Sequence, residues 1–562
     1  MKTWNIGNTT VRNPQRLREA LQLFKITMDG RSFGRVEQQE YLNELVRSNL
    51  VDSARNTEGD DGGRKFASAF KQLGFVTNWS RGQSWNMTGV GTLLVEHPEL
   101  EETIFLRQLL KYQIPSPLEN GSTVRGFRVR PFRLLLRFLK RAYDEQLVGL
   151  TKFEIGLYVI TLLTEDDAPF EAAFTNIKAF RIAYDSLTGL VAKKRFAFER
   201  LRKVAQSLRL VRDTLLDYAD STSRYALMSG LLTIRGNKLA ISEARLPFVQ
   251  AILTDGSDLI SESAYLGIFY DAELPSLPTD NLVFIRTQIT SLERQLTNLT
   301  MQTGETVIVP VVPLEATLSM LQGHEIELRK LLRQVREVQF YHTQRTQVAL
   351  AEIEELLESI KEGTLIGRDV YAPAYFEWAI WRLFLAINDL VGPISKTRGF
   401  NIDDDIHPIH HAQGGAADLT FTYDDFKLVC EMTLTSGSRQ FAAEGEPVTR
   451  HVFSEREKSG DKPVYGLFVA RKLDPNTADA FHHARYWRNR KQHVDTPVVA
   501  LEIEQIIALV QRIRQQPVTS TAIRELLDSI LQMQDTYLYG PDWYEAYSEL
   551  YEQWISTSGS NA

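Results

Sequence analysis

Residues 281–362 constrain the architecture more than any other part of the chain. Leucine, isoleucine and valine recur there every three or four residues, with charged residues in the gaps. This spacing places the apolar side chains on one face of a helix. Pro310 and Pro313 interrupt the pattern, which therefore predicts two antiparallel helices joined between residues 304 and 313. A spacer of this kind would separate two globular halves.

The flanking sequence is typical of a multidomain α+β protein, because 562 residues are too many for one hydrophobic core. We predict domains at 1–118 and 119–280, a helical linker at 281–364 and an α/β domain at 365–562. The single cysteine, Cys430, excludes an internal disulfide or a CxxC zinc site and suits the cytoplasm. No apolar run approaches the roughly 20 residues that span a bilayer, so we expect no membrane partner.

Charge is distributed unevenly along the chain. Residues 1–250 contain 37 Lys and Arg against 27 Asp and Glu, whereas the remainder contains 27 against 44. A basic half suggests a polyanionic partner such as double-stranded DNA, although solvated charge can also be distributed by chance. The segment 121–143 contains seven basic residues and no acid, and a second basic cluster covers residues 193–203.

Two segments of the basic half predict a helix followed by a β-hairpin. In the first, a helix over 64–73 precedes strands at 75–77 and 85–87, and Thr88 can cap the next helix. In the second, a helix over 217–228 precedes two short strands that flank a Gly-Asn turn. This order is the outline of a winged helix, although a helix and hairpin can also serve only to build a core.

In a winged helix, one helix can enter the major groove while the hairpin contacts phosphate. The side chains placed to do so lie on the second helix and its hairpin. They are Ser221, Ser223, Arg224, Tyr225, Arg235 and Lys238. The basic segment before them adds Arg125, Arg128 and Arg130 as candidate DNA-binding residues.

The acidic half contains two carboxylates that a predicted hairpin would bring together. Strands at 419–423 and 426–433 flank Asp424-Asp425, so Asp418 and Glu431 can lie at adjacent strand ends. Carboxylate oxygens, water and phosphate are the ligands that Mg²⁺ prefers, and a bound Mg²⁺ would activate water for attack on a phosphodiester. Thr433 stands where many nucleases of the PD-(D/E)xK type have lysine.

Several further residues are candidates for the same site. Glu446 could be a ligand or hold its helix in place, and Glu377 lies in an aromatic helix where it would be either another site acid or a solvent-facing residue. The missing positive charge could come from Arg439, Arg450 or His451. A zinc site formed by the histidines at 407, 410 and 411 is a weaker hypothesis, because no HExxH framework accompanies them.

Taken together, these segments resemble the AlwI-like family of type IIS restriction endonucleases. The resemblance is strongest over four segments and weakest in the helical spacer. The segments are FEWAIW (376–381), the run from His410 to Phe441, EPVTRH (446–451) and DSTSRYALMSGLLTIRGNKL (220–239). FLRQLLKYQIPSP (105–117) and the opening stretch around Arg12 also look like the family.

The resemblance implies winged-helix recognition subdomains, a helical linker and a C-terminal PD-(D/E)xK-like nuclease domain. It implies a short asymmetric site, cleavage a few base pairs away with Mg²⁺, and a cognate DNA methyltransferase in a bacterial cytoplasm. Asp418 and Glu431 would be the metal ligands, and Glu377, Glu446 and His451 would complete the site with Thr433. One active site would cut one strand, so the protein would nick DNA or need a second copy or a smaller nuclease subunit.

Two other functions stay open at this stage. A DNA-binding regulator, or the binding subunit of a complex, could retain an inactive nuclease-like domain. Cleavage of RNA is a third possibility, although nothing in the sequence resembles an RNA-binding module.

Overall fold

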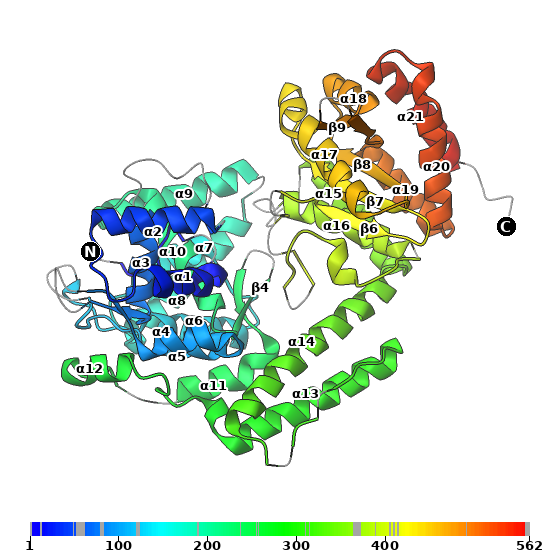
Figure 1. Cartoon of the computed structure of the whole chain (residues 1–562). Coiled ribbons are helices and arrows are strands. Elements are labelled where there is room, and N and C mark those ends of the chain that lie inside the picture. The colour runs from blue at the N-terminus through cyan, green and yellow to red at the C-terminus, as the bar shows by residue number, and fades with distance from the viewer. Residues whose placement is uncertain are drawn as a thin grey trace. The chain divides into compact units, whose positions relative to one another are not determined.

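The computed structural model divides the chain into two compact units, residues 1–291 with 310–327 and residues 292–309 with 328–562 (Figure 1). The placed residues are 3–11, 14–48, 50–51, 62–78, 84–119, 124–187, 190–235, 238–254, 256, 258–309, 311–313, 315–363, 372–387, 389–403, 406–408, 411–412, 415–489 and 492–556. The helices and strands named below lie within these ranges. Each unit is described by itself.

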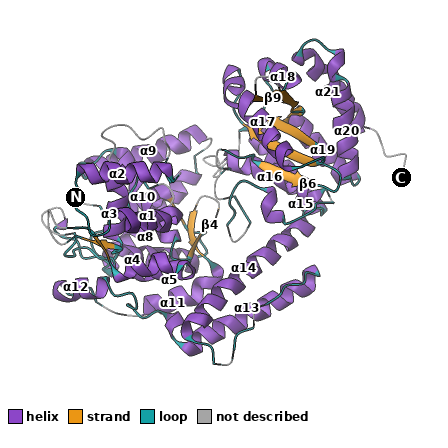
Figure 2. Ribbon diagram, viewed as in Figure 1, coloured by secondary structure: helices purple, strands orange, loops and turns teal. Residues whose placement is uncertain are grey.

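The first unit is mainly helical, with two small sheets (Figure 2). Its helices are α1 (Leu17–Thr27), α2 (Arg35–Arg47), α3 (Gly62–Gln72), α4 (Gly89–Glu96), α5 (Glu101–Lys111), α6 (Pro131–Asp144), α7 (Lys152–Glu154), α8 (Asp167–Asp185), α9 (Leu190–Ser207), α10 (Arg212–Leu227), α11 (Leu246–Thr254) and α12 (Glu262–Phe269). Its strands are β1 (Val76–Thr77), β2 (Asn86–Met87), β3 (Leu150–Thr151), β4 (Leu232–Arg235) and β5 (Lys238–Ile241).

Both predicted helix-and-hairpin segments form in this unit. β1 pairs antiparallel with β2 after α3, and the Thr88 hydroxyl caps α4 by accepting a hydrogen bond from the Gly91 backbone N–H at 3.0 Å. β4 pairs antiparallel with β5 after α10, and β3 adds a third strand that the sequence did not indicate. The two hairpin turns themselves, at 79–83 and 236–237, lie outside the described residues. The winged-helix assignment stays a prediction.

A continuous hydrophobic core fills the first unit. One cluster of buried apolar side chains extends from Trp4 to Leu277. It joins the aromatic group around Phe24 and Phe70 to the apolar face of α6, where Leu135 and Phe138 are fully buried. The predicted boundary between residues 118 and 119 therefore does not separate two cores, and the domain limits stay a prediction.

The leucine-rich segment forms α13 (Leu282–Thr303) and α14 (Leu318–Thr343), which run parallel rather than antiparallel as predicted. Near the starts of the two helices, Gln322 donates a hydrogen bond to Asp280 at 3.1 Å, and near their ends Gln339 donates one to Gln302 at 3.2 Å. The prediction was wrong because the connection over 304–317 is long. Extended chain covers about 3.3 Å per residue, enough to return along a helix that rises 1.5 Å per residue.

The second unit is built around a four-stranded sheet in the order β11-β8-β7-β6. The strands are β6 (Leu419–Thr422), β7 (Lys427–Thr433), β8 (Val464–Ala470) and β11 (Val498–Glu502), and the limits of β6 and β7 are close to those that the sequence predicts. β6 is antiparallel to β7, whereas β7, β8 and β11 are parallel. All seven residues of β8 are buried, as expected for a parallel strand covered on both faces.

Helices cover both faces of this sheet (Figure 2). One face packs against α17 (Ser438–Lys458) and α18 (Pro475–His482), and the other against α16 (Ala372–Ala386) and α19 (Ile503–Gln515). The remaining elements are α15 (Gln347–Glu362), α20 (Ser520–Gln532), α21 (Gly540–Ser556) and a hairpin of β9 (Arg485–Asn489) with β10 (Gln492–Asp495). None of the described helices is long and apolar enough to cross a membrane.

Candidate active site

Asp418 and Glu431 lie together at one end of the β6–β7 hairpin, as the sequence predicts. Leu419 pairs with Cys430 in the antiparallel ladder, so the preceding and following residues, Asp418 and Glu431, face each other across the two strands. The Asp418 carboxylate accepts a hydrogen bond from the Met432 backbone N–H at 2.9 Å, which fixes its orientation. Asp418 is half-buried and Glu431 is buried.

Glu377 contributes a third carboxyl group from α16. Its side chain is buried, which excludes the solvent-facing alternative for this residue. One carboxylate oxygen accepts a hydrogen bond from the Ala412 backbone N–H at 2.7 Å. The negative charges of Asp418 and Glu431 raise the pKa of Glu377, in addition to the larger effect of burial. Three acids from three separate segments of the chain therefore meet at this site.

These acids are largely buried close together, and the charge of Arg450 only partly offsets the effect of burial on Glu431. Burial raises the pKa of Glu431 to about 8, and burial together with the charge of Glu431 raises the pKa of Asp418 well above its usual range. Within the described part of the chain, no lysine or arginine forms an ion pair with Glu377, Asp418 or Glu431. A cluster of this kind is unfavourable in the charged state unless a cation or protons neutralise it.

His451 contacts the acid cluster from α17. Its Nδ1 lies 2.6 Å from a Glu431 carboxylate oxygen, while its Nε2 is buried and has no hydrogen-bond partner among the described residues. Burial and the nearby Arg450 lower the pKa of His451. A neutral ring that donates from Nδ1 keeps a lone pair on Nε2, which is therefore an unsatisfied acceptor inside the site.

On α17 the acid that faces the cluster is Glu444 rather than the predicted Glu446. Glu444 raises the pKa of both Asp418 and Glu431 through its charge. Glu446 leaves 63% of its side chain exposed and pairs with Arg450 at 3.0 Å. Seven residues make about two helical turns, so Glu444 shares a face with His451, whereas Glu446 is rotated away from it. This spacing was the available signal for Glu444, and the sequence analysis missed it.

The other residues proposed for the site have separate positions. Thr433 is buried on β7 and accepts a hydrogen bond from the Thr435 backbone N–H at 3.1 Å, and Arg439 is exposed on the first turn of α17. His407 stacks on Trp378 at 4.9 Å between ring centres, His411 is exposed, and residue 410 is outside the described residues. Across the placed residues, no group of three or more His, Cys, Asp or Glu side chains is arranged to hold a metal.

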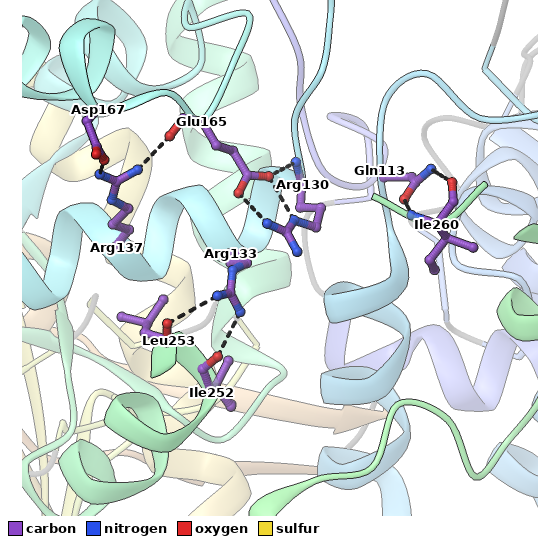
Figure 3. Close-up of polar contacts among 9 residues, drawn as sticks. All are labelled: Gln113, Arg130, Arg133, Arg137, Glu165, Asp167, Ile252, Leu253 and Ile260. Carbon is purple, nitrogen blue, oxygen red and sulfur yellow. Dashed lines mark hydrogen bonds and ion pairs between the residues drawn. The ribbon is translucent and has the colours of Figure 1, made fainter. Parts of the chain in front are cut away.

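Most of the seven basic residues of 121–143 form hydrogen bonds or ion pairs within the first unit, and Figure 3 shows three of them. Arg130 forms a two-pronged ion pair with Glu165, at 3.0 and 2.9 Å, and Arg137 pairs with Asp167. Arg133 donates hydrogen bonds to two backbone carbonyl groups at the end of α11. Arg130 is thus paired within the fold, and its assignment as a DNA-binding residue stays a prediction.

Other candidates from the basic half have mixed positions. Arg125 and Arg128 are exposed and make no side-chain contact within the described residues. Arg235 pairs with Glu243 at 3.2 Å, and Lys238 is half-buried on β5. Arg12 lies outside the described residues.

The four side chains nominated on α10 are directed into the protein, which corrects their assignment to a DNA groove. Tyr225 and Ser221 have no exposed surface, and the Ser221 hydroxyl donates to the Ile6 carbonyl at 2.6 Å. Ser223 donates to the Ala219 carbonyl at 2.8 Å, and Arg224 to Asp220 and to backbone carbonyl groups of the N-terminal segment. The reason is that residues 5–11 pack along this face of α10. Gly7 has a φ of +75°, and any Cβ there would overlap the Tyr225 ring.

The second unit thus holds an acid cluster at the end of a sheet, and the first unit is mainly helical with exposed cations. The comparison with known families identifies the class of protein to which the chain belongs. The AlwI restriction endonuclease family matches residues 71–509, and the chain belongs to that family. It is therefore a restriction endonuclease, a hydrolase that acts on DNA.

Among solved structures, the chain is similar to the small subunit of the heterodimeric restriction endonuclease R.BspD6I. The identity is 26% over 36% of this chain and 98% of that chain, with a TM-score of 0.30. It is also similar to the binding domain of the BpuJ1 endonuclease in complex with modified DNA, at 14% identity over 48% and 95%, TM-score 0.31. A third similarity is to the restriction endonuclease FokI, at 12% identity over 93% and 99%, TM-score 0.24. No curated protein matches the chain.

Proposed function

We propose that this restriction endonuclease is of type IIS, with a short asymmetric recognition site and Mg²⁺-dependent cleavage a few base pairs away. The observation that supports the metal requirement is the cluster of Glu377, Asp418 and Glu431, with which no described lysine or arginine forms an ion pair. A divalent cation would supply that missing charge and would favour the ionised carboxylates. An oxygen donor set also suits Mg²⁺ better than zinc.

In this proposal Asp418 and Glu431 would hold Mg²⁺ through their carboxylate oxygens. When bound, the ion would supply Lewis acidity toward the phosphate and a water molecule. The Met432 N–H holds Asp418 in place, and His451 holds Glu431 through Nδ1. The unsatisfied Nε2 of His451 is then available to accept a hydrogen bond from the attacking water.

One acid cluster in a chain can cut one strand in one event. We therefore propose that the protein nicks DNA, or that cleavage of the second strand requires a second copy or a smaller nuclease subunit. A PD-(D/E)xK-like sheet would present the cluster to DNA, and the first unit would recognise the sequence. A cognate methyltransferase would protect the host DNA in the bacterial cytoplasm.

Incubation with supercoiled plasmid and Mg²⁺ tests the proposal, with Asp418→Asn as the matched variant. Asn keeps the size of the side chain but removes its charge. We expect the wild type to produce nicked or linear DNA, and expect EDTA or Asp418→Asn to reduce the rate by about 10³-fold. Run-off sequencing of both strands would give the site and the cutting distance. Binding of duplex DNA by the wild type without any cleavage would favour the alternative function, a DNA-binding regulator with an inactive nuclease domain.

A further inference from the structure

α9 presents basic side chains that nothing in the described protein neutralises. The helix contains six lysine or arginine residues and one acid, Glu199. Two of the six are used internally, since Lys193 is buried against the Tyr184 ring and Arg200 lies over the Phe196 ring. The other four make no ion pair or hydrogen bond with any described residue. They are Lys194, Arg195, Arg202 and Lys203.

The rotation of α9 is fixed by its buried side. Ala197, Leu201 and Ala205 recur every four residues and have at most 1% of their surface exposed. At 100° per residue, Arg195 lies about 120° and Arg202 about 100° from the middle of that side, on the same flank of the helix. The helix lies at an edge of the first unit (Figure 1), and the Arg195 and Arg202 side chains are exposed.

Four of the α9 cations form no ion pair with a described residue, although an acid on the same helix stands at a spacing that allows ion pairs. Glu199 stands four residues after Arg195 and four before Lys203, the spacing at which helical ion pairs form, yet it pairs with neither. On α6, by contrast, Lys140 and Arg141 pair with acids four residues later, at 2.6 and 2.8 Å. Grouped cations of this kind repel one another until a polyanion approaches.

We propose that Arg195, Arg202 and Lys203 form a surface that binds the phosphate backbone of double-stranded DNA. This inference rests on the proposed function and adds an element to it. The guanidinium groups of Arg195 and Arg202 leave the helix about 10 Å apart along its axis, far enough to reach different phosphates. Such contacts hold the duplex and strengthen binding at low salt, and they do not distinguish between base sequences.

The test measures how affinity for a fluorescent 30-base-pair duplex depends on salt, in EDTA so that no cleavage occurs. The α9 variant is the double substitution Arg195→Gln with Arg202→Gln. The control is Arg35→Gln with Lys396→Gln, which removes the same charge from two exposed residues elsewhere that have no described partner. We expect the α9 variant to bind about tenfold more weakly at 0.1 M salt. We also expect the slope of log K against log salt to decrease by about 2 in magnitude.

The control should change the slope by less than about 0.5, and both proteins should retain the wild-type circular dichroism spectrum and melting temperature. Equal effects of the two doubles would show that only net charge matters, and would overturn the inference. An unchanged slope in the α9 double would do the same. Glu199→Gln should shift affinity in the opposite direction, to tighter binding. Failure of the proposed function would differ, since the wild type would then bind DNA with full salt dependence but not cut plasmid in Mg²⁺.

Discussion

Two regions of the protein each concentrate one sign of charge: the acid cluster of the second unit and the arginine-rich segment of the first. They differ in whether the folded chain pairs those charges with the opposite sign. Arg130 and Arg137 are matched by Glu165 and Asp167, so their charges serve the fold. Glu377, Asp418 and Glu431 form no ion pair with lysine or arginine among the placed residues, and only Glu431 contacts a histidine. A run of like charge in a sequence therefore does not by itself indicate a ligand. The better indicator is charge that the folded chain leaves uncompensated.

The difference also has an energetic side. Loss of one partner from a partly buried, bidentate ion pair strongly destabilises the fold, because the other charge remains without compensation. An uncompensated acid cluster behaves in the opposite way, because removing one carboxylate relieves repulsion. We therefore expect substitutions in the two regions to have opposite effects on stability.

The largest effect is expected for Glu431→Gln. Loss of this carboxylate should reduce cleavage by about 10³-fold, since Glu431 is a proposed metal ligand. The same substitution should raise the melting temperature of the metal-free protein at pH 8, because it removes a buried negative charge beside Asp418. Plasmid cleavage and thermal denaturation in EDTA measure the two effects, and a stability loss in the variant would contradict the comparison.

The stability difference should depend on pH. The pKa of Glu431 is about 8 in the folded protein against 4.5 for an ordinary glutamate. Below pH 4.5 the Glu431 carboxyl is protonated in both the folded and the unfolded protein, so its titration does not change the free energy of unfolding. Between pH 4.5 and 8 the unfolded state loses its proton first, and the wild type becomes less stable as pH rises. The advantage of Glu431→Gln should grow over this window and then level off, and Mg²⁺ should reverse its sign.

The next effect concerns the paired region. Arg130→Gln should lower the free energy of unfolding by about 3 kcal/mol, because Glu165 would keep its charge without a partner. Arg128→Gln is the matched control, since Arg128 is exposed and makes no side-chain contact within the described residues. Urea denaturation measures both. A large loss of DNA affinity in folded Arg130→Gln, without loss of stability, would show that Arg130 binds DNA after all.

The sequence predicted local structure well, because periodicity and turn residues are local properties. It placed both hairpins of the first unit and the strands β6 and β7 of the second, and the β6–β7 hairpin then brought Asp418 and Glu431 together. It could not predict which partner a charged side chain meets when that partner is distant in sequence. Glu165 is 35 residues from Arg130, and Ile6 is 215 residues from Ser221.

Two misses have different causes. The direction of α14 relative to α13 depends on the path of a 14-residue connection, which no periodicity encodes. Glu446 was nominated as part of the EPVTRH segment and Glu444 was not considered, although helical geometry places Glu444 on the face of His451.

A smaller effect on the cleavage rate is expected to distinguish the two acids of α17, Glu444 and Glu446. Glu444→Gln should lower the cleavage rate about tenfold, because this charge acts on both proposed ligands and should strengthen metal binding. Glu446→Gln should change it less than twofold, since Glu446 is exposed and pairs with Arg450. Titration of the cleavage rate against Mg²⁺ should show a higher half-saturating concentration for the first variant alone. Equal effects would mean that both acids serve the site.

The smallest effect concerns an uncharged polar group. It tests whether such a group, once hydrogen-bonded within the fold, is also unavailable to DNA. Ser221 has no exposed surface and its hydroxyl is satisfied by the Ile6 carbonyl, so Ser221→Ala should cost about 1 kcal/mol of unfolding free energy. Its effect on DNA affinity should be negligible, since a satisfied internal group has nothing left to offer a ligand. Urea denaturation and duplex binding of the same protein decide between the two roles. Weaker DNA binding with unchanged stability would mean that residues 5–11 leave α10 when DNA binds, and that internal pairing does not exclude a role in recognition.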